Sequence, residues 1–250
     1  MSKEKSQLKI LLLQIRDEPN TRREELESFA QYSDLAVEQF DILNVFDTPE
    51  FDQSVLAGYD ALYVGGSSEA SVLEPENYPF VIPAQALLRD CVELKMPVFA
   101  SCFGHQLAVK ALGGDIVHDE RDFEMGTIPI YLNDVAATDT LYRGVSDGFI
   151  AVSVHRERTT EPPQGCTQLA FTESCCHSFK VDGAPFWTTQ FHPEVDLRVL
   201  IERLTVFKDK YTEGDGHLQR VLDSAEETPE SNNLLKSFVD RVLIGAEGRD

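Results

Sequence analysis

The stretch "PVFASCFGHQLAVKALGG", residues 97–114, places an apolar run directly before a cysteine and an amphipathic segment directly after it. The run "PVFAS" predicts a buried strand, and "GHQLAVKAL" predicts a helix that Gly113 ends in a left-handed conformation. Cys102 stands between the small residues Ala100 and Gly104. A strand, a sharp turn of small residues and a helix are typical of a nucleophile elbow, and a buried structural cysteine is the alternative interpretation.

A thiol at this turn would lie at the start of a helix, where free amides and the helix dipole favour the reactive thiolate. A thiolate needs a base, and "FHPE" at residues 191–194 offers one at the end of an apolar strand. Pro193 favours an extended backbone at His192, so that Glu194 falls on the same side and can orient the imidazole. Of the other candidate histidines, His105 is expected to pack beside the elbow, and three lack an evident orienting group: His118, His177 and His217.

The glycine pair Gly65-Gly66 ends another predicted buried strand, "ALYV" at residues 61–64. Glycine lets a backbone amide approach a ligand closely, because no Cβ stands in the way. The amides of Gly66 and Phe103 could together form an oxyanion hole, which stabilises the negative charge on a carbonyl oxygen during acyl transfer. The alternative is an ordinary turn between a strand and a helix.

Short apolar runs alternate with amphipathic segments through the first half of the chain. They predict buried strands at residues 8–15, 40–47, 61–66 and 97–101, and a helix at 79–95. Another helix is expected to begin at a capping box of Thr21 and Glu24. Later runs rich in β-branched and aromatic residues predict partly antiparallel strands: "GTIPIYL", "FIAVSV", "CTQLAFT", "SFKV" and "FWTTQF". The fold class is therefore α/β, with a central, mostly parallel sheet flanked by helices and extended by antiparallel strands.

The chain is expected to divide into a domain at residues 1–211 and an acidic C-terminal extension at residues 212–250. A helical face runs from Asp196 to about Tyr211, and the extension carries nine acidic and four basic residues. One amphipathic helix is predicted inside the extension, with Leu234, Leu235, Phe238, Val239 and Val242 on its apolar side. This helix either packs on the main domain or docks a partner.

Charge and composition exclude several classes of function. A net charge of −21 disfavours nucleic acid and anionic membranes as partners, because binding them draws on Lys and Arg. No run reaches the roughly 20 apolar residues of a membrane helix, and the polar N-terminus lacks a signal-peptide pattern, so a cytoplasmic protein is expected. Five cysteines do not suggest a disulfide framework. Because Cys175, Cys176 and His177 lack a second ligand pair, neither a metal nor a cofactor is expected.

The motifs, in this order, resemble those of the class I glutamine amidotransferases. The matching stretches cover roughly residues 8–211: Gly65-Gly66 after a strand, "CFGHQ" at 102–106, "ALGG" at 111–114, "EMG" at 124–126 and "QFHPEV" at 190–195. The resemblance implies a flavodoxin-like layering of the α/β fold. It also implies an enzyme that acts on a small molecule, glutamine or another γ-glutamyl compound, and releases ammonia from glutamine through a thioester.

By this resemblance Cys102 would be the nucleophile, His192 the general acid and base, and Glu194 the carboxylate that orients His192. Gly66 and Phe103 would supply the amides of the oxyanion hole. These residues together make a Cys-His-Glu triad with its oxyanion hole.

The substrate-binding residues depart in part from the family pattern. Gln106 would contact the amino-acid end of the substrate. "His155-Arg156-Glu157" stands where the family usually has His-Gly-Asp, a segment that helps to line the glutamine pocket. Arg156 favours a substrate larger than free glutamine, because a guanidinium could bind an additional carboxylate. Ala100 replaces a glycine that is common two residues before the cysteine, and keeps the site small.

Three functions fit this resemblance. Because no synthetase domain follows in this sequence, the chain could deliver ammonia to a separate synthetase subunit. It could instead be a γ-glutamyl peptidase that acts on γ-glutamyl peptides or glutathione conjugates. A catalytically silent interaction protein is the third interpretation. The related intracellular protease and glyoxalase-like group also has a cysteine elbow but relies on an early glutamate, so His192-Pro193-Glu194 favours the amidotransferase family.

Overall fold

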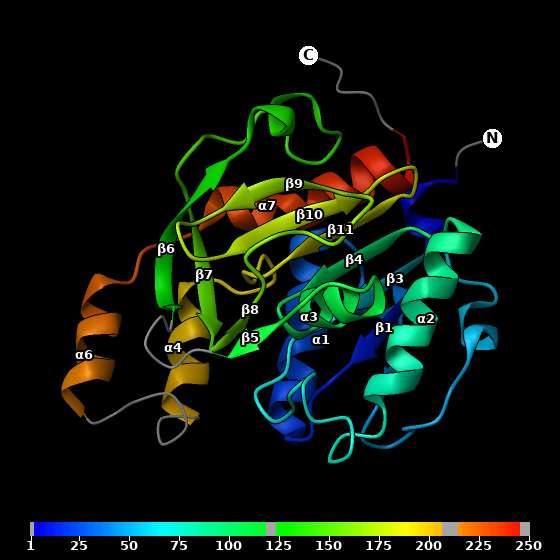
Figure 1. Ribbon diagram of the computed structural model, residues 1–250, viewed down its shortest axis with the longest axis horizontal. Coiled ribbons are helices and arrows are strands. Elements are labelled where there is room, and N and C mark those ends of the chain that lie inside the picture. The colour runs from blue at the N-terminus through cyan, green and yellow to red at the C-terminus, as the bar shows by residue number, and fades with distance from the viewer. Residues whose placement is uncertain (1–2, 119–123, 207–214, 246–250) are drawn as a thin grey trace.

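One mixed sheet forms the centre of the computed structural model, which describes residues 3–118, 124–206 and 215–245. Within these residues nine strands pair in the order β2-β1-β3-β4-β11-β10-β9-β6-β7 (Figure 1). Their bounds are β1 (Ile10–Gln14), β2 (Phe40–Asn44), β3 (Ala61–Val64), β4 (Val98–Ser101), β6 (Glu124–Leu132), β7 (Phe149–His155), β9 (Cys166–Phe171), β10 (Cys176–Val181) and β11 (Phe186–Thr189). The strands from β2 to β11 in this order are parallel, and the remaining pairs are antiparallel. The predicted fold class is therefore confirmed.

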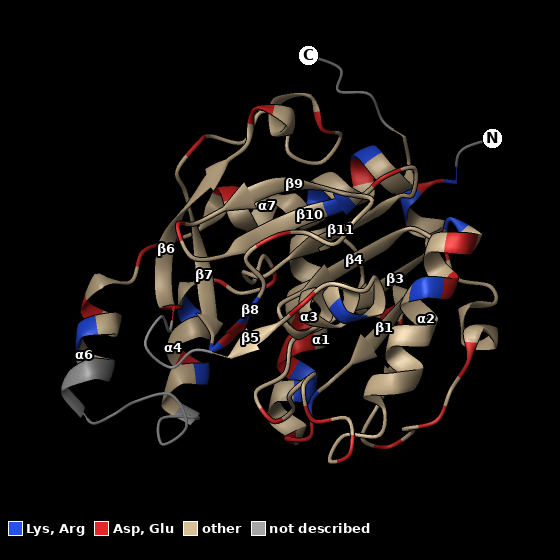
Figure 2. Ribbon diagram, viewed as in Figure 1, with Lys and Arg blue, Asp and Glu red and all other residues tan. Residues whose placement is uncertain are grey.

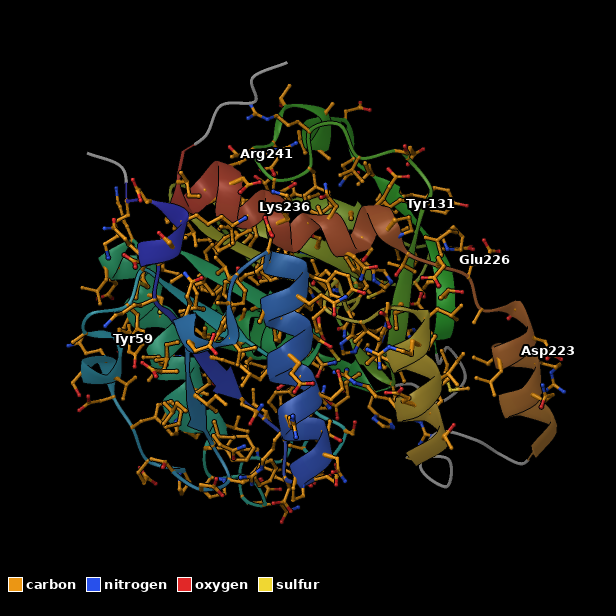
Figure 3. The ribbon with its side chains drawn as sticks, turned by 180° about the vertical axis from the view of Figure 1, so that it is seen from behind. Tyr59, Tyr131, Asp223, Glu226, Lys236 and Arg241 are labelled. Carbon is orange, nitrogen blue, oxygen red and sulfur yellow. The ribbon has the colours of Figure 1, made fainter. Side chains whose placement is uncertain are left out.

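Helices cover both faces of the sheet. On one face lie α2 (Val81–Leu94) and α3 (Phe103–Ala111), and on the other lie α1 (Pro19–Ser33) and α7 (Pro229–Ser237), which Figure 3 shows from behind. Beside β6 and β7 stand α4 (Leu197–Val206) and α6 (Asp215–Ser224). The shorter elements are η1 (Lys5–Gln7), η2 (Val37–Gln39), η3 (Gln53–Leu56), η4 (Asp134–Thr138), the π-turn η5 (Phe238–Leu243), and the small pair β5 (Val117–His118) and β8 (Glu157–Arg158).

The central strands are buried on both faces, as their continuous apolar runs predict. Every residue of β1, β3 and β4 is buried. Because side chains alternate along a strand, Leu11 and Leu13 pack towards α2 and α3, whereas Ile10 and Leu12 pack towards α1 and α7. Two apolar cores thus sandwich the sheet.

The start of α1 differs from the predicted capping box. The helix begins at Pro19, before Thr21, and its N-cap is Glu18, whose carboxylate accepts a hydrogen bond from the Thr21 amide at 2.7 Å. Proline suits this first position because its fixed φ is already helical and it has no amide hydrogen to leave unpaired. The capping-box prediction with Glu24 was wrong, whereas the left-handed Gly113 after α3 is present at φ +82°.

The amphipathic segment near the C-terminus forms α7 and η5, and it completes the core behind the sheet. Leu234, Leu235 and Phe238 are buried there, and the Phe238 ring lies 5.7 Å from Tyr63 and 5.4 Å from Phe99 between centroids. The predicted division of the chain at residue 211 falls outside the described residues.

Charged side chains are distributed over the helices and loops, and acidic ones outnumber basic ones in the sequence (Figure 2). In the part of the chain that the structure describes, no helix has the length and apolar character needed to cross a bilayer.

Removing the Phe238 ring tests whether the C-terminal segment belongs to the core. Phe238→Ala is expected to lower the free energy of unfolding by about 3–5 kcal/mol, because it leaves a cavity among the rings of Tyr63, Phe99 and Trp187. Urea denaturation followed by circular dichroism measures the change. Ile82→Ala is the control, because that side chain is 56% exposed and should change the stability little. Equal stability of the two variants would contradict a core role for this segment.

Candidate active site

The proposed site residues meet at one edge of the sheet. Because β3, β4 and β11 are parallel neighbours, the loops that follow them leave at the same edge. Gly66 follows β3, Cys102 follows β4, and His192 lies three residues after the end of β11. Three predicted positions, widely separated in the sequence, are thereby brought together.

Cys102 occupies a strained turn. Its φ of 50° and ψ of −104° lie outside the regions that a residue with a side chain ordinarily adopts. Such strain costs about 1–3 kcal/mol and persists only where surrounding contacts impose it. Here the Cys102 amide donates to the Thr189 carbonyl at 2.7 Å. A Cβ at Gly104 would lie 2.8 Å from the Val64 carbonyl oxygen, so only glycine allows α3 to approach β3 this closely.

The surroundings of the Cys102 thiol suit a nucleophile. Phe103 is the first residue of α3, so its amide has no partner within the helix and points positive charge at the turn. The cysteine is 5% exposed, and it lies beside His192, since a Cβ added at Gly66 would come within 3.5 Å of the Cys102 Cβ and 2.9 Å of the His192 ring. A thiolate held beside an imidazole is the arrangement that nucleophilic cysteines require.

His192 and Glu194 form a buried pair next to this thiol. Nδ1 of His192 lies 2.6 Å from Oε1 of Glu194, and the two side chains are 7% and 0% exposed. Burial alone would lower the pKa of His192, but the negative charges of Cys102 and Glu194 outweigh burial and raise this pKa to about 9. Burial would raise the pKa of Glu194, but His192 and Arg203 outweigh burial and lower that pKa to about 2. The buried pair therefore favours the imidazolium form of His192 beside an ionised Glu194.

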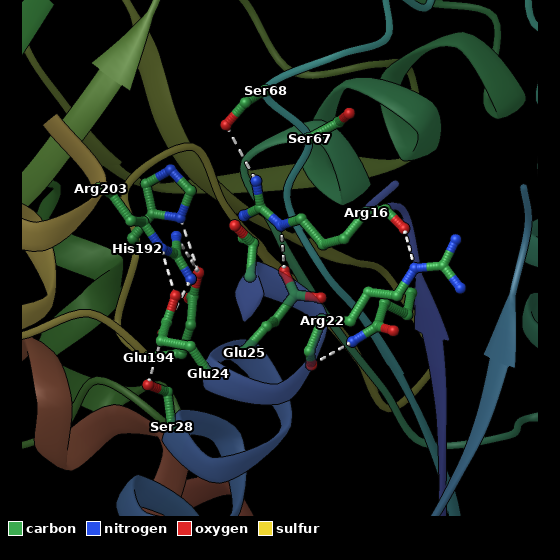
Figure 4. Close-up of polar contacts among 12 residues, drawn as sticks. Arg16, Arg22, Glu24, Glu25, Ser28, Ser67, Ser68, His192, Glu194 and Arg203 are labelled. Carbon is green, nitrogen blue, oxygen red and sulfur yellow. Dashed lines mark hydrogen bonds and ion pairs between the residues drawn. The ribbon is translucent and has the colours of Figure 1, made fainter. Parts of the chain in front are cut away.

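Side chains from distant elements hold this pair in place (Figure 4). Arg203 of α4 binds Glu24 of α1 at 2.8 Å and lies 3.9 Å from Glu194. Asn232 of α7 donates to the Pro193 carbonyl at 2.8 Å, so the C-terminal helix supports the backbone between His192 and Glu194. This loop is thereby tied to three helices.

A second buried pair supports the glycine turn. Arg16 lies 2.9 Å from Glu25, with side-chain exposures of 1% and 0%, and it donates to the Ser68 hydroxyl at 3.1 Å. A Cβ at Gly66 would lie 2.9 Å from both the Arg16 guanidinium and the His192 ring, and 3.5 Å from the Cys102 Cβ. Only glycine therefore fits between Arg16 and the side chains of Cys102 and His192.

Sequence reasoning missed Arg16, Glu25 and Arg203 as parts of this site. A charged residue directly after a buried apolar strand was the available signal at Arg16, because burying a charge is costly unless a partner compensates it. Nothing local to the sequence identifies Arg203, since its contact with Glu24 spans 179 positions.

A cleft of about 300 Å³ opens beside Cys102, and four of the residues in its wall are Phe103, Gln106, His155 and Arg156. Gln106 is fixed there, because its amide donates to the Glu157 carbonyl at 2.8 Å. The structure thus brings the three predicted substrate-binding residues to the cysteine.

Two histidines near the elbow use a ring nitrogen in contacts inside the protein. Nε2 of His155 lies 2.8 Å from Glu124. This histidine therefore forms part of the cleft wall, and its Nε2 is not available to a ligand in the cleft. His105 packs as expected, with Nδ1 2.9 Å from the Thr188 hydroxyl and its ring against Phe179.

Glu124 also gathers a second group of potential ligands. His155 and His177 each place Nε2 2.8 Å from the same oxygen of Glu124, and Cys175 lies within the same cluster. Burial would raise the pKa of Glu124, but the hydrogen bonds from the two histidines hold it well below its usual value. The sequence showed Cys175 and His177 without a second ligand pair, and β6 and β7 supply that pair in the fold.

Comparisons with known proteins agree with this fold. The family model described as glutamine amidotransferase class-I matches residues 56–208. The glutamine-hydrolyzing GMP synthase subunit from Sulfurisphaera tokodaii is 31% identical over 169 residues, which cover 66% of this chain and 85% of the relative. Gamma-glutamyl peptidase 3 from Arabidopsis thaliana is 26% identical, with 66% of each chain covered.

A solved glutamine amidotransferase from Thermotoga maritima superimposes on the fold with a TM-score of 0.76 at 20% identity, covering 95% of this chain and 98% of that one. The chain spans only 21% to 30% of the longer GMP synthases from Borreliella burgdorferi and Borrelia garinii. The family match covers more than half of the 250 residues. This chain, with its cysteine elbow and its His192–Glu194 pair at one sheet edge, belongs to the class I glutamine amidotransferase family.

Proposed function

We propose that this protein hydrolyses a γ-glutamyl amide through a cysteine thioester, with glutamine as the substrate and glutamate and ammonia as the products. The observation that carries the proposal is the strained Cys102 beside His192, an imidazole that Glu194 orients at 2.6 Å. Cys102 acts as the nucleophile, His192 as the general acid and base, and Glu194 as the orienting carboxylate.

In the first half of the reaction, the Cys102 thiolate attacks the side-chain carbonyl carbon of glutamine. The amides of Gly66 and Phe103 stabilise the oxyanion that forms, and the protonated His192 gives its proton to the departing nitrogen, which leaves as ammonia. In the second half, neutral His192 takes a proton from water, and the resulting hydroxide attacks the thioester and releases glutamate. Both halves use the same imidazole in its two protonation states.

The cleft determines which γ-glutamyl compound reaches the thiol. Gln106 and Arg156 lie in its wall with His155, and we assign to Gln106 a contact with the amino-acid end of the substrate. The Arg156 guanidinium is suited to a carboxylate beyond the reacting amide. This placement supports a second candidate function, a γ-glutamyl peptidase that cleaves γ-glutamyl peptides or glutathione conjugates.

The two functions differ in the leaving group, which is ammonia from glutamine and the amine of the next residue from a γ-glutamyl peptide. The relative from Sulfurisphaera tokodaii is named as one subunit of a GMP synthase, which supports a role in which this chain passes ammonia to a separate synthetase subunit. The relative from Arabidopsis thaliana is named as a peptidase, which supports a chain that acts without a synthetase. The third candidate, a silent interaction protein, requires that Cys102 does not react.

Loss of the nucleophile should abolish turnover. Cys102→Ala is expected to reduce glutamine hydrolysis by at least about 10⁴-fold, because the thioester can no longer form. Ammonia release measures turnover, and mass spectrometry after labelling with diazo-norleucine reports whether Cys102 is alkylated. Cys91→Ala is the matched control, because it removes another buried thiol, from α2. Unlabelled Cys102 in folded wild-type protein would favour the silent interaction protein.

The pH dependence should report the protonation state of His192. The imidazolium is present below its pKa of about 9 and is lost as the pH rises through that value. We therefore expect kcat/KM to fall on the alkaline side near pH 9, because deprotonated His192 cannot protonate the departing ammonia.

Glu194→Gln tests whether Glu194 raises the pKa of His192. It removes one of the negative charges that raise the pKa of His192, so the alkaline fall should move to lower pH. An unchanged alkaline limb in this variant would contradict the assigned role of Glu194.

Arg156→Gly separates the two candidate substrates. If Arg156 binds an additional carboxylate, the variant should lose about 1.5–3 kcal/mol of binding to a γ-glutamyl peptide, or about 10- to 150-fold in kcat/KM, and keep its activity on glutamine. Glutamate release from glutamine and from a panel of γ-glutamyl peptides, glutathione included, gives the comparison. Unchanged activity on the peptides would end the argument for Arg156, and faster release from glutamine in the wild type would favour an ammonia donor.

A further inference from the structure

Four potential metal ligands meet inside the antiparallel part of the sheet. They are Glu124 at the start of β6, His155 at the end of β7, Cys175 just before β10, and His177 within β10. One ligand atom from each residue lies within 4.8 Å of all the others. Glu124 is half-buried and the other three residues are buried. None of these four residues belongs to the Cys102–His192–Glu194 group.

The donor set suits a zinc-class cation. Imidazole nitrogen, thiolate sulfur and carboxylate oxygen are the ligands of tetrahedral zinc sites. Two neutral histidines, one thiolate and one carboxylate would balance the charge of a divalent ion, so the filled site would bury no net charge. Bond lengths of about 2.0–2.1 Å put neighbouring tetrahedral ligands about 3.3 Å apart. The two histidine nitrogens lie 2.8 Å from Glu124, so small shifts of the side chains would admit the ion.

The hydrogen bonding of the cluster is incomplete among the described residues. Both imidazoles share a single oxygen of Glu124, and Nδ1 of His155 and Nδ1 of His177 are buried without a hydrogen-bond partner among the described residues. Buried polar atoms are ordinarily paired, so each exception calls for an explanation. The other Glu124 oxygen accepts from the Thr172 hydroxyl at 2.8 Å, an outer contact of the kind that orients a metal-binding carboxylate.

We propose that Glu124, His155, Cys175 and His177 bind one divalent zinc-class cation. The ion would join β6 and β7 to the start of β10, and it would fix His155 in the wall of the cleft. The proposal stands apart from the proposed function, because none of its ligands takes part in the acyl transfer. The competing explanation is a hydrogen-bonded cluster that binds no metal.

The test measures metal binding directly in the full-length chain. The Cys102→Ala background removes the reactive thiol as a competing ligand. After chelator treatment, titration with Co²⁺ is expected to reach one equivalent and to give the charge-transfer absorption of a cobalt–thiolate bond. Elemental analysis of the protein purified with added Zn²⁺ should find one zinc per chain. Absence of stoichiometric binding in both measurements would overturn the proposal.

Variants assign the ligands. In the same background Cys175→Ser should lose the charge-transfer band, and His177→Gln should weaken zinc binding in competition with a chelator by more than about 100-fold, because loss of an outer contact alone costs about 10- to 100-fold. Cys176→Ala is the matched control, since its thiol is buried next in sequence but contacts the Ser178 carbonyl instead. Zn²⁺ should raise the thermal midpoint of the control and leave that of Cys175→Ser unchanged. Binding that Cys175→Ser and His177→Gln leave intact would place the metal elsewhere and contradict the assignment.

Discussion

The Cys102 thiol can meet the His192 imidazole only because β4 and β11 run parallel and in register, so that the loops after both strands leave the sheet at the same edge. The same pairing positions the Thr189 carbonyl, which accepts a hydrogen bond from the Cys102 amide. This bond helps to hold Cys102 in its strained turn. The strain of about 1–3 kcal/mol is sustained by the buried strands on either side, which cannot relax without losing their packing. A reactive geometry is thus a consequence of sheet topology.

The buried charged side chains at this edge of the sheet lie next to side chains of opposite charge. The Arg16–Glu25 pair supports the glycine turn, and Arg203 joins Glu24 to the neighbourhood of Glu194. Removing one partner of such a pair leaves an unpaired buried charge and costs several kcal/mol, so these groups hold the loops in one arrangement. The C-terminal helix takes part as well, through Asn232 and the Pro193 carbonyl. The segment after residue 215 therefore contributes to the same site as the central strands.

Local sequence patterns predict much of this arrangement. The rest depends on contacts between residues that are far apart in the sequence. The elbow around Cys102, the glycine turn at Gly66 and the β11 loop at His192 are each signalled by neighbours within a few residues, and parallel strands then bring them together. The partnership of Arg203 with Glu24 has no local signal, because it depends on how α1 and α4 pack. The cluster around Glu124 was missed for the same reason, since β6 and β7 supply Glu124 and His155, which lie far in the sequence from Cys175 and His177. The helix start at Glu18 was missed because two nearby patterns can cap a helix. The Thr21–Glu24 capping box was chosen over the Glu18 carboxylate before Pro19.

The central claim is that Cys102 forms a covalent thioester during turnover. Rapid mixing of the protein with glutamine, followed by acid quench and mass spectrometry of the digested chain, measures this directly. The account predicts a γ-glutamyl group on the peptide that contains Cys102, appearing together with the first ammonia and disappearing as glutamate is released. Glutamine hydrolysis with no adduct on that peptide, or with an adduct on Cys175 instead, would contradict it.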